Sequence, residues 1–128
     1  MLTLHLGIHF GLARIVQLDP ATGAVVRTML NTLPDCAGNL TVDPLSGDLF
    51  LTDSCNGSDH TGGIYRVENP SSASPTLVTY ATPPTGLVPG QIAFAPDGTI
   101  YVTAAAGSLN GPTSVDEIQG TNTTSLAG

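Results

Sequence analysis

The chain repeats itself with a period of about 50 residues, and this repeat limits the possible folds more than any other feature. The segment RIVQLDP at 14–20 returns as IYRVENP at 64–70. A longer block recurs as well, with NLTVDP and GDLFLTD at 39–44 and 47–53 returning as QIAFAP and GTIYVTA at 91–96 and 98–104. Periods of about 20 to 50 residues are typical of chains built from stacked repeat units.

Each repeat unit contains four short runs of β-forming residues joined by turns in which Pro comes early and Gly late, as in 43–48 (DPLSGD). Four antiparallel strands per unit are typical of a propeller blade. The expected strands are 2–10, 13–18, 24–30, 39–43, 48–53, 63–68, 76–81, 91–95, 99–103, 113–118 and 122–126. The sequence therefore predicts an all-β fold of antiparallel four-stranded propeller blades, about two and a half of which are present.

The predicted organisation is a single β-propeller fragment, 1–128. It comprises a partial blade 1–33, a full blade 34–83, and a blade 84–128 with a weakly patterned C-terminal end. A propeller closes with about four to eight blades, so we expect the chain to be part of a longer protein. The alternatives are that copies assemble into a ring or that the units form an open stack. Open blade edges favour self-association in each case.

Charge excludes several classes of partner and reaction. The net charge is −7, and the three basic residues are all arginines. Nucleic acid needs a basic surface, so it is not an expected partner, and no apolar run is long enough to span a membrane. The absence of lysine also excludes a P-loop and Schiff-base chemistry.

The block GNLTVDPLSGDLFLTD at 38–53, followed by GIYRV at 63–67, resembles the blade of NHL-type propellers. It is also similar to gluconolactonase-like and virginiamycin B lyase-like members of the six-bladed, TolB-like superfamily. The resemblance covers residues 14–104 and implies the propeller architecture.

In the gluconolactonase-like enzymes, carboxylates and an Asn just before the first strand of a blade hold one divalent cation on the propeller axis. The positions of this chain that match the Asn are Gly38 and Gly90, which are followed by the amide residues Asn39 and Gln91.

Two loops of the full blade carry the candidate binding residues. Because strand direction alternates, the loops 33–38 and 54–62 are expected at the same end of the blade. These loops and the strand end before the second of them carry the candidate metal ligands Asp35, Asp53, Asn56 and Asp59, with His60 nearby. Oxygen-rich loops favour Ca²⁺, the one cofactor that the sequence indicates. The alternative is that these Asp and Asn residues serve turns and caps.

No catalytic motif is present, so no catalytic residue is assigned. We expect a binding or scaffold module outside the cytoplasm, non-catalytic as it stands. A protein or small-molecule ligand would bind on the loop face, since long loops on a rigid scaffold carry most binding sites. The alternative is a metal-dependent, gluconolactonase-like hydrolase whose remaining ligands lie on further blades.

Cys36 and Cys55 are predicted to form a disulfide. The hairpin pairs Asp43 with Asp48, and the same register counted outward places Cys36 opposite Cys55, within disulfide reach. A bulge would shift this register and leave two reduced thiols instead. An isolated pair of this kind favours an extracellular or periplasmic location.

Intact mass before and after reduction checks this pair. We expect the denatured, unreduced protein to resist alkylation and to take up two alkyl groups after reduction. Closing this loop should stabilise the fold by about 3 kcal/mol. A Cys55→Ser variant is the control, and two alkylatable thiols before reduction would contradict the prediction.

Overall fold

The computed structural model describes residues 2–5, 13–34, 36–53, 63–82, 87–106, 113–119 and 122–127. These residues form strands and turns, without a helix. The strands are β1 (Leu2–His5), β2 (Arg14–Leu18), β3 (Val25–Leu30), β4 (Ala37–Val42), β5 (Leu49–Asp53), β6 (Gly63–Glu68), β7 (Thr76–Ala81), β8 (Leu87–Phe94), β9 (Ile100–Ala106), β10 (Thr113–Gln119) and β11 (Asn122–Ala127). A helix of the length and apolar character needed to cross a bilayer does not occur in this described part.

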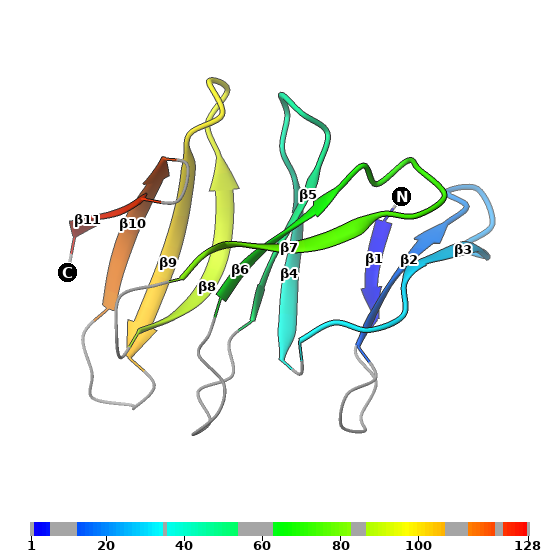
Figure 1. The fold of residues 1–128 in the computed structure, drawn as a ribbon, viewed down its shortest axis with the longest axis horizontal. Coiled ribbons are helices and arrows are strands. Elements are labelled where there is room, and N and C mark those ends of the chain that lie inside the picture. The colour runs from blue at the N-terminus through cyan, green and yellow to red at the C-terminus, as the bar shows by residue number, and fades with distance from the viewer. Residues whose placement is uncertain are drawn as a thin grey trace.

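The strands form three antiparallel sheets in which each strand pairs with its neighbours in sequence. The orders are β1-β2-β3, β4-β5-β6-β7 and β11-β10-β9-β8 (Figure 1). The sheets follow one another in chain order, and the first strand of the third sheet, β8, contacts β4, β5 and β6 of the second. The predicted all-β, antiparallel fold is confirmed. The unit boundaries near 33 and 83 stay predictions, and residues 6–10 of the first predicted strand lie outside the described part.

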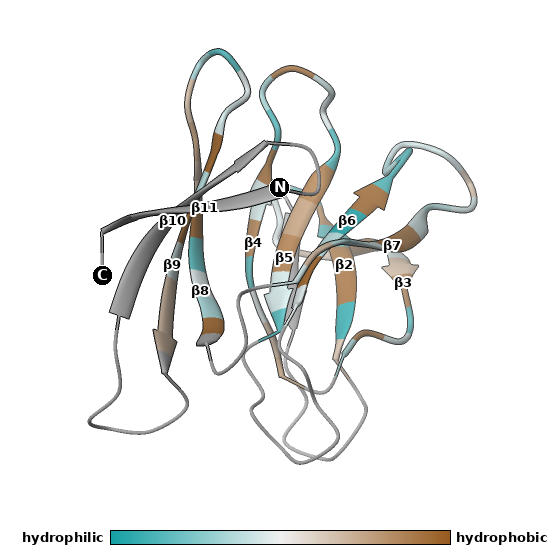
Figure 2. Cartoon of the chain, turned by 60° about the vertical axis from the view of Figure 1, so that its left-hand side comes forward, coloured by the Kyte–Doolittle hydropathy of each residue, from teal (hydrophilic) through white to brown (hydrophobic). Residues whose placement is uncertain are grey.

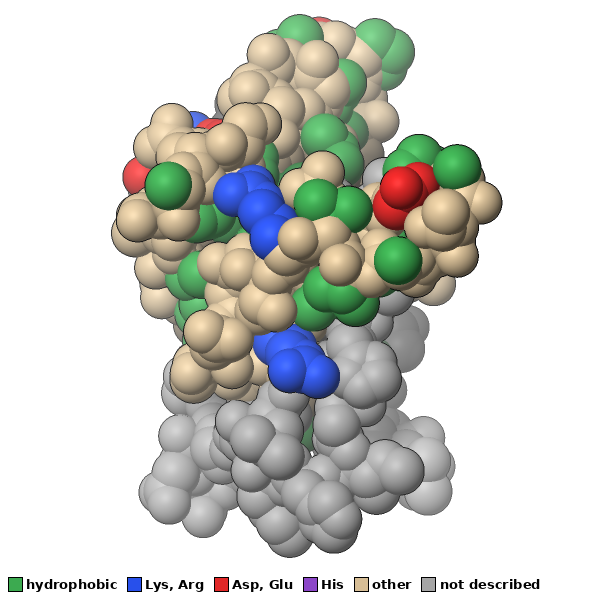
Figure 3. Space-filling view, turned by 90° about the vertical axis from the view of Figure 1, so that its right-hand side faces the viewer, with side chains coloured by type: hydrophobic (Ala, Val, Ile, Leu, Met, Phe, Trp, Pro, Cys, Tyr) green, Lys and Arg blue, Asp and Glu red, His purple; other side chains and the backbone are tan. Residues whose placement is uncertain are grey.

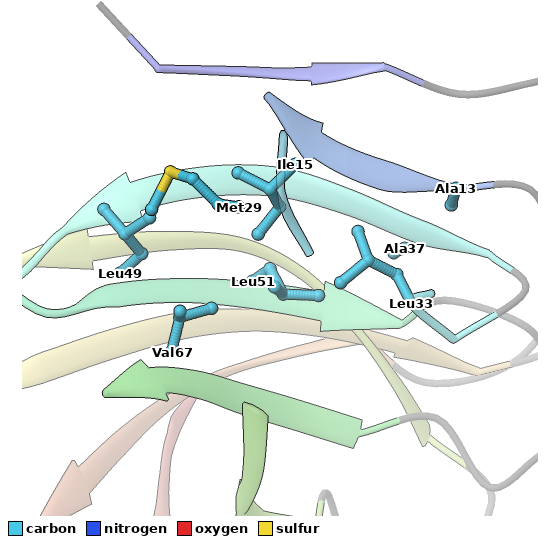
Figure 4. Packing of buried hydrophobic residues seen from close by; sticks show 8 residues of the cluster. All are labelled: Ala13, Ile15, Met29, Leu33, Ala37, Leu49, Leu51 and Val67. Atoms are coloured by element: carbon cyan, nitrogen blue, oxygen red, sulfur yellow. The ribbon is translucent and has the colours of Figure 1, made fainter. Parts of the chain in front are cut away.

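Strand β5 of the second sheet is buried on both faces, as its continuous apolar run predicts. All five residues of β5 are buried. Leu49 and Leu51 join a core cluster between the first and second sheets, where Ile15 and Met29 come from the first sheet (Figure 4). The brown stretches along β2 and β5 in Figure 2 mark these apolar segments.

Phe50 points to the opposite face of β5 and forms the centre of the second core. Its ring lies edge-on to Tyr80 and Phe94, with centroid distances of 5.0 and 5.1 Å. Ile64, Ile100 and Val102 complete this cluster, which holds the second and third sheets together. Aromatic pairs in this geometry add about 0.5 to 1.5 kcal/mol each beyond the area they bury.

Glycine ends the tight turns as predicted. Gly23, Gly47 and Gly98 have φ values of 74°, 77° and 89°, a region that L side chains rarely adopt. In the β4–β5 turn, Gly47 donates its N–H to the carbonyl of Asp43 at 2.9 Å. A Cβ placed on Gly98 would lie 2.7 Å from Cδ1 of Leu45, so the β4–β5 turn rests on the β8–β9 turn.

Two details differ from the sequence-based expectation. Strand β8 begins at Leu87, before Pro89 and Gly90, although these residues were expected to end a loop. Pro89 is tolerated because β8 is an edge strand of its sheet, where a missing N–H breaks no required ladder bond. Val42 was expected to be covered but is 50% exposed, because it lies where β4 leaves the core.

Core and surface leucines of the second sheet should respond differently to truncation. Leu51→Ala should lower the free energy of unfolding by about 2 to 5 kcal/mol, since the side chain is 0% exposed. Leu45→Ala, in a side chain that is 67% exposed, should change it by less than about 0.5 kcal/mol. Chemical denaturation of both variants checks this, and equal losses would show that β5 is not the centre of the core.

Candidate functional site

The first strands of the second and third sheets each carry a bulge at a corresponding place. In β4 the register passes from Gly38–Thr52 to Leu40–Leu51, so Asn39 has no partner on β5. Asn39 adopts a φ of 40°, an uncommon value for a residue with a side chain. In β8 the register passes from Pro89 to Ile92, which leaves Gly90 and Gln91 without partners on β9. We call these two bulges, one at Asn39 and the other at Gly90 and Gln91, the bulge pair.

The two bulges lie next to each other across the boundary between the sheets. The carbonyl oxygen of Gly90 accepts a hydrogen bond from the Thr52 hydroxyl at 2.9 Å and one from Asn39 Nδ2 at 3.5 Å. Thr52 is 1% exposed, so its bond to Gly90 satisfies a buried hydroxyl. The bulge in β8 therefore places the carbonyl oxygen of Gly90 within hydrogen-bond distance of the buried Thr52 hydroxyl.

Glycine is required at position 90 by close packing. A Cβ at Gly90 would lie 2.6 Å from Oγ1 of Thr103, and this oxygen accepts the N–H of Gln91 at 3.0 Å. A side chain at position 90 would therefore push Thr103 away from Gln91. In the sequence, only the dipeptide Pro89-Gly90 marks this position, and it predicts a turn instead of a strand bulge.

The side chains of Asn39 and Gln91 are exposed. Each amide can donate and accept hydrogen bonds without carrying a charge. Positive φ at a residue with a side chain and bulges in edge strands are both over-represented at binding sites. The bulge pair is therefore the best-defined candidate site among the described residues.

Asp53 lies at the end of β5 and is 3% exposed. Its backbone pairs with Ala37 and with Gly63. Burial raises the pKa of Tyr65 above its ordinary value, and the negative charge of Asp53 raises it further. The phenol therefore stays protonated, and Asp53 lies in a part of the protein with little water.

Asp53 is the one predicted metal ligand within the described residues. Asp35, Asn56 and Asp59 lie outside them, as does His60, so the predicted ligand cluster stays a prediction. In the described ranges, no group of three or more His, Cys, Asp or Glu side chains could hold a metal ion.

The register used to pair the cysteines is wrong at the mouth of the hairpin. The bulge at Asn39 shifts the pairing by one residue, so Ala37 lies opposite Asp53. Cys36 is half-buried and is not a free thiol. Cys55 lies outside the described part, so its pairing with Cys36 stays a prediction.

A partly buried ion pair lies at the opposite end of the second sheet, at the β4–β5 turn. Oδ2 of Asp48 accepts hydrogen bonds from Arg66 Nε at 2.8 Å and Nη2 at 2.6 Å. Asp48 Oδ1 accepts the N–H of Asn69 at 3.3 Å. The hydrogen bond to Asp48 raises the pKa of Arg66 despite partial burial. Sequence reasoning missed this pair, although strand alternation places opposite charges on one face of β5 and β6.

No family model matches the chain, and a search of the curated proteins finds no match.

Removing the charge of Asp48 should destabilise the fold more than removing that of Glu68. Asp48→Asn should cost about 1 to 3 kcal/mol, because it weakens charged hydrogen bonds to Arg66 in a partly buried site. Glu68→Gln should cost less than about 0.5 kcal/mol, since Glu68 is 3.9 Å from Arg66 and its side chain is 40% exposed. Urea unfolding at neutral pH compares the two, and equal effects would mean that Asp48 has no special role.

Proposed function

We propose that the chain is part of an antiparallel β-propeller and acts as a binding or scaffold module outside the cytoplasm. The three sheets would be consecutive blades, of which the first shows three strands. The ligand, a protein or a small molecule, would bind near the bulge pair, at the end of the sheets that carries Asp53.

The order of the strands supports the blade assignment. Each sheet is a simple up-and-down series of neighbouring strands, as in a propeller blade. In a propeller the first strand of each blade lines the central axis, and under this proposal β4 and β8 would be those first strands. These two strands are in contact, and β1 also contacts β4 (Figure 1).

The bulge pair is the observation that carries the binding role. It presents two exposed amide side chains, Asn39 and Gln91, on adjacent first strands. The resemblance to gluconolactonase-like propellers matches its cation-binding Asn to the neighbouring positions, Gly38 and Gly90. Amide oxygens are suitable ligands for Ca²⁺, and Asp53 and Asp59 would supply charge from the same end of the sheet.

The location outside the cytoplasm is supported by the predicted Cys36–Cys55 pair, because such bonds persist in oxidising compartments. The charge of −7 suits a soluble binding surface without affinity for nucleic acid.

Calcium titration by calorimetry tests the role of the bulge pair. We expect weak binding, on the order of 10⁻⁴ to 10⁻³ M, as in extracellular modules. Asn39→Gly should abolish it, because glycine keeps the backbone conformation and removes the amide.

The matched control is Asn69→Gly, which makes the same change at the other described asparagine with positive φ, 52°. This variant should bind Ca²⁺ as the wild type does. Asp59→Asn should weaken binding if the loop contributes charge. Equal heats from the wild type and both glycine variants, or no heat at millimolar Ca²⁺, would contradict a cation site at the bulge pair.

A further inference from the structure

A groove lies between the first and second sheets at the end opposite Asp53. Its volume is about 430 Å³. The groove is lined by Gln17, Arg27, Met29, Val42, Gly47, Leu49, Pro70 and Ser71. Pockets that bind small molecules commonly measure about 300 to 1,000 Å³. The groove is large enough for a small organic ligand and is separate from the bulge pair.

Arg27 of β3 is held in a fixed position at this groove. Its Nε donates to Oε1 of Gln17 at 3.1 Å, and Nη1 donates to the carbonyl oxygen of Ser72 at 2.7 Å. Nη2 donates to the carbonyl oxygen of Pro70. A guanidinium has five N–H groups, and these three bonds use one on each nitrogen. Each terminal nitrogen therefore retains a second N–H.

The acceptors that hold Arg27 are neutral, so they orient its charge without neutralising it. Within the described ranges, the ion pairs between side chains are those of Arg66 with Asp48 and Glu68. Figure 3 looks onto the side of the first sheet, where separate arginine side chains (blue) lie on a surface that is mostly apolar or uncharged. A partly buried cation in these surroundings favours an anion, above all a carboxylate that accepts two N–H groups.

Part of the groove wall is apolar and lies beside the polar lining of Gln17 and Ser71. Met29 and Leu49 are 7% and 1% exposed and belong to the core cluster between the sheets. Val42 is 50% exposed and adds an accessible apolar wall. A ligand that covers Val42 would remove apolar surface from water, which adds about 25 cal/mol for each Å² buried.

We propose that this groove binds a small aliphatic carboxylate, with its carboxylate on Arg27 and its hydrocarbon chain mainly against Val42, beside the edge of Met29. The positive charge of Arg27 lies beside the apolar surface of Val42. This arrangement favours an aliphatic carboxylate over a neutral or cationic molecule of the same shape. This second site goes beyond the proposed function, because it lies at the other end of the sheets and does not depend on a cation.

Titration of the full 128-residue chain with sodium hexanoate, followed by the amide signals of the ¹⁵N-labelled protein, tests the proposal. We expect saturable shifts at Gln17, Gly47 and Ser71, and none with hexanamide at the same concentration. Arg27→Lys keeps the charge but loses the two-pronged geometry, so it should bind hexanoate at least about tenfold more weakly.

Val42→Glu and Val26→Glu form a matched pair of variants that do not alter Arg27. Both valines are exposed, at 50% and 60%, but Val26 does not line the groove. Val42→Glu should abolish the shifts through repulsion of the carboxylate, and Val26→Glu should leave them unchanged. Equal shifts with hexanamide, hexanoate binding that survives Val42→Glu, or no saturable shift at any millimolar concentration would overturn the proposal.

Discussion

The burial of β5 on both faces is the constraint on which the rest of the structure depends. Leu49 and Leu51 face the first sheet and Phe50 faces the third, so one strand of five residues joins two hydrophobic cores. A strand that is apolar on both sides cannot be stable in a single sheet with one face in water. The neighbouring sheets are therefore required for the second sheet to be stable, and they stack in chain order.

Polar contacts between neighbouring sheets fix how these sheets are aligned along one another. Thr52 reaches the carbonyl oxygen of Gly90 on the third sheet, and Arg27 of the first sheet reaches the carbonyl oxygens of Pro70 and Ser72 on the second. In both cases a side chain donates to a backbone carbonyl, which has a fixed position, whereas apolar contacts tolerate sliding. These bonds therefore set where one sheet lies along the next.

The sequence predicts the regular parts of the fold because their causes are local. Alternation and turn residues indicate the strands and the glycine turns, and the continuous run 49–51 indicates a strand buried on both faces. The sequence leaves a bulge in this hairpin open as an alternative register, and its position at Asn39 follows from the strand pairing of the structure. The Asp48–Arg66 pair and the groove at Arg27 were missed, because each requires the spatial relation of two strands or two sheets.

The contact of Leu45 with Gly98 is asymmetric, because the two neighbouring turns contribute different residues to it. The turn of the second sheet presents a leucine, and the turn of the third receives it at a residue without a Cβ. The receiving turn, from Ala95 to Thr99, is shorter and carries Pro96 and Asp97 in place of a leucine. A duplicated copy of the third unit could follow the second but could not pass the same contact on. An array lengthened by gene duplication would therefore repeat this contact only where units were copied from the second repeat, which carries both a turn leucine and a turn glycine.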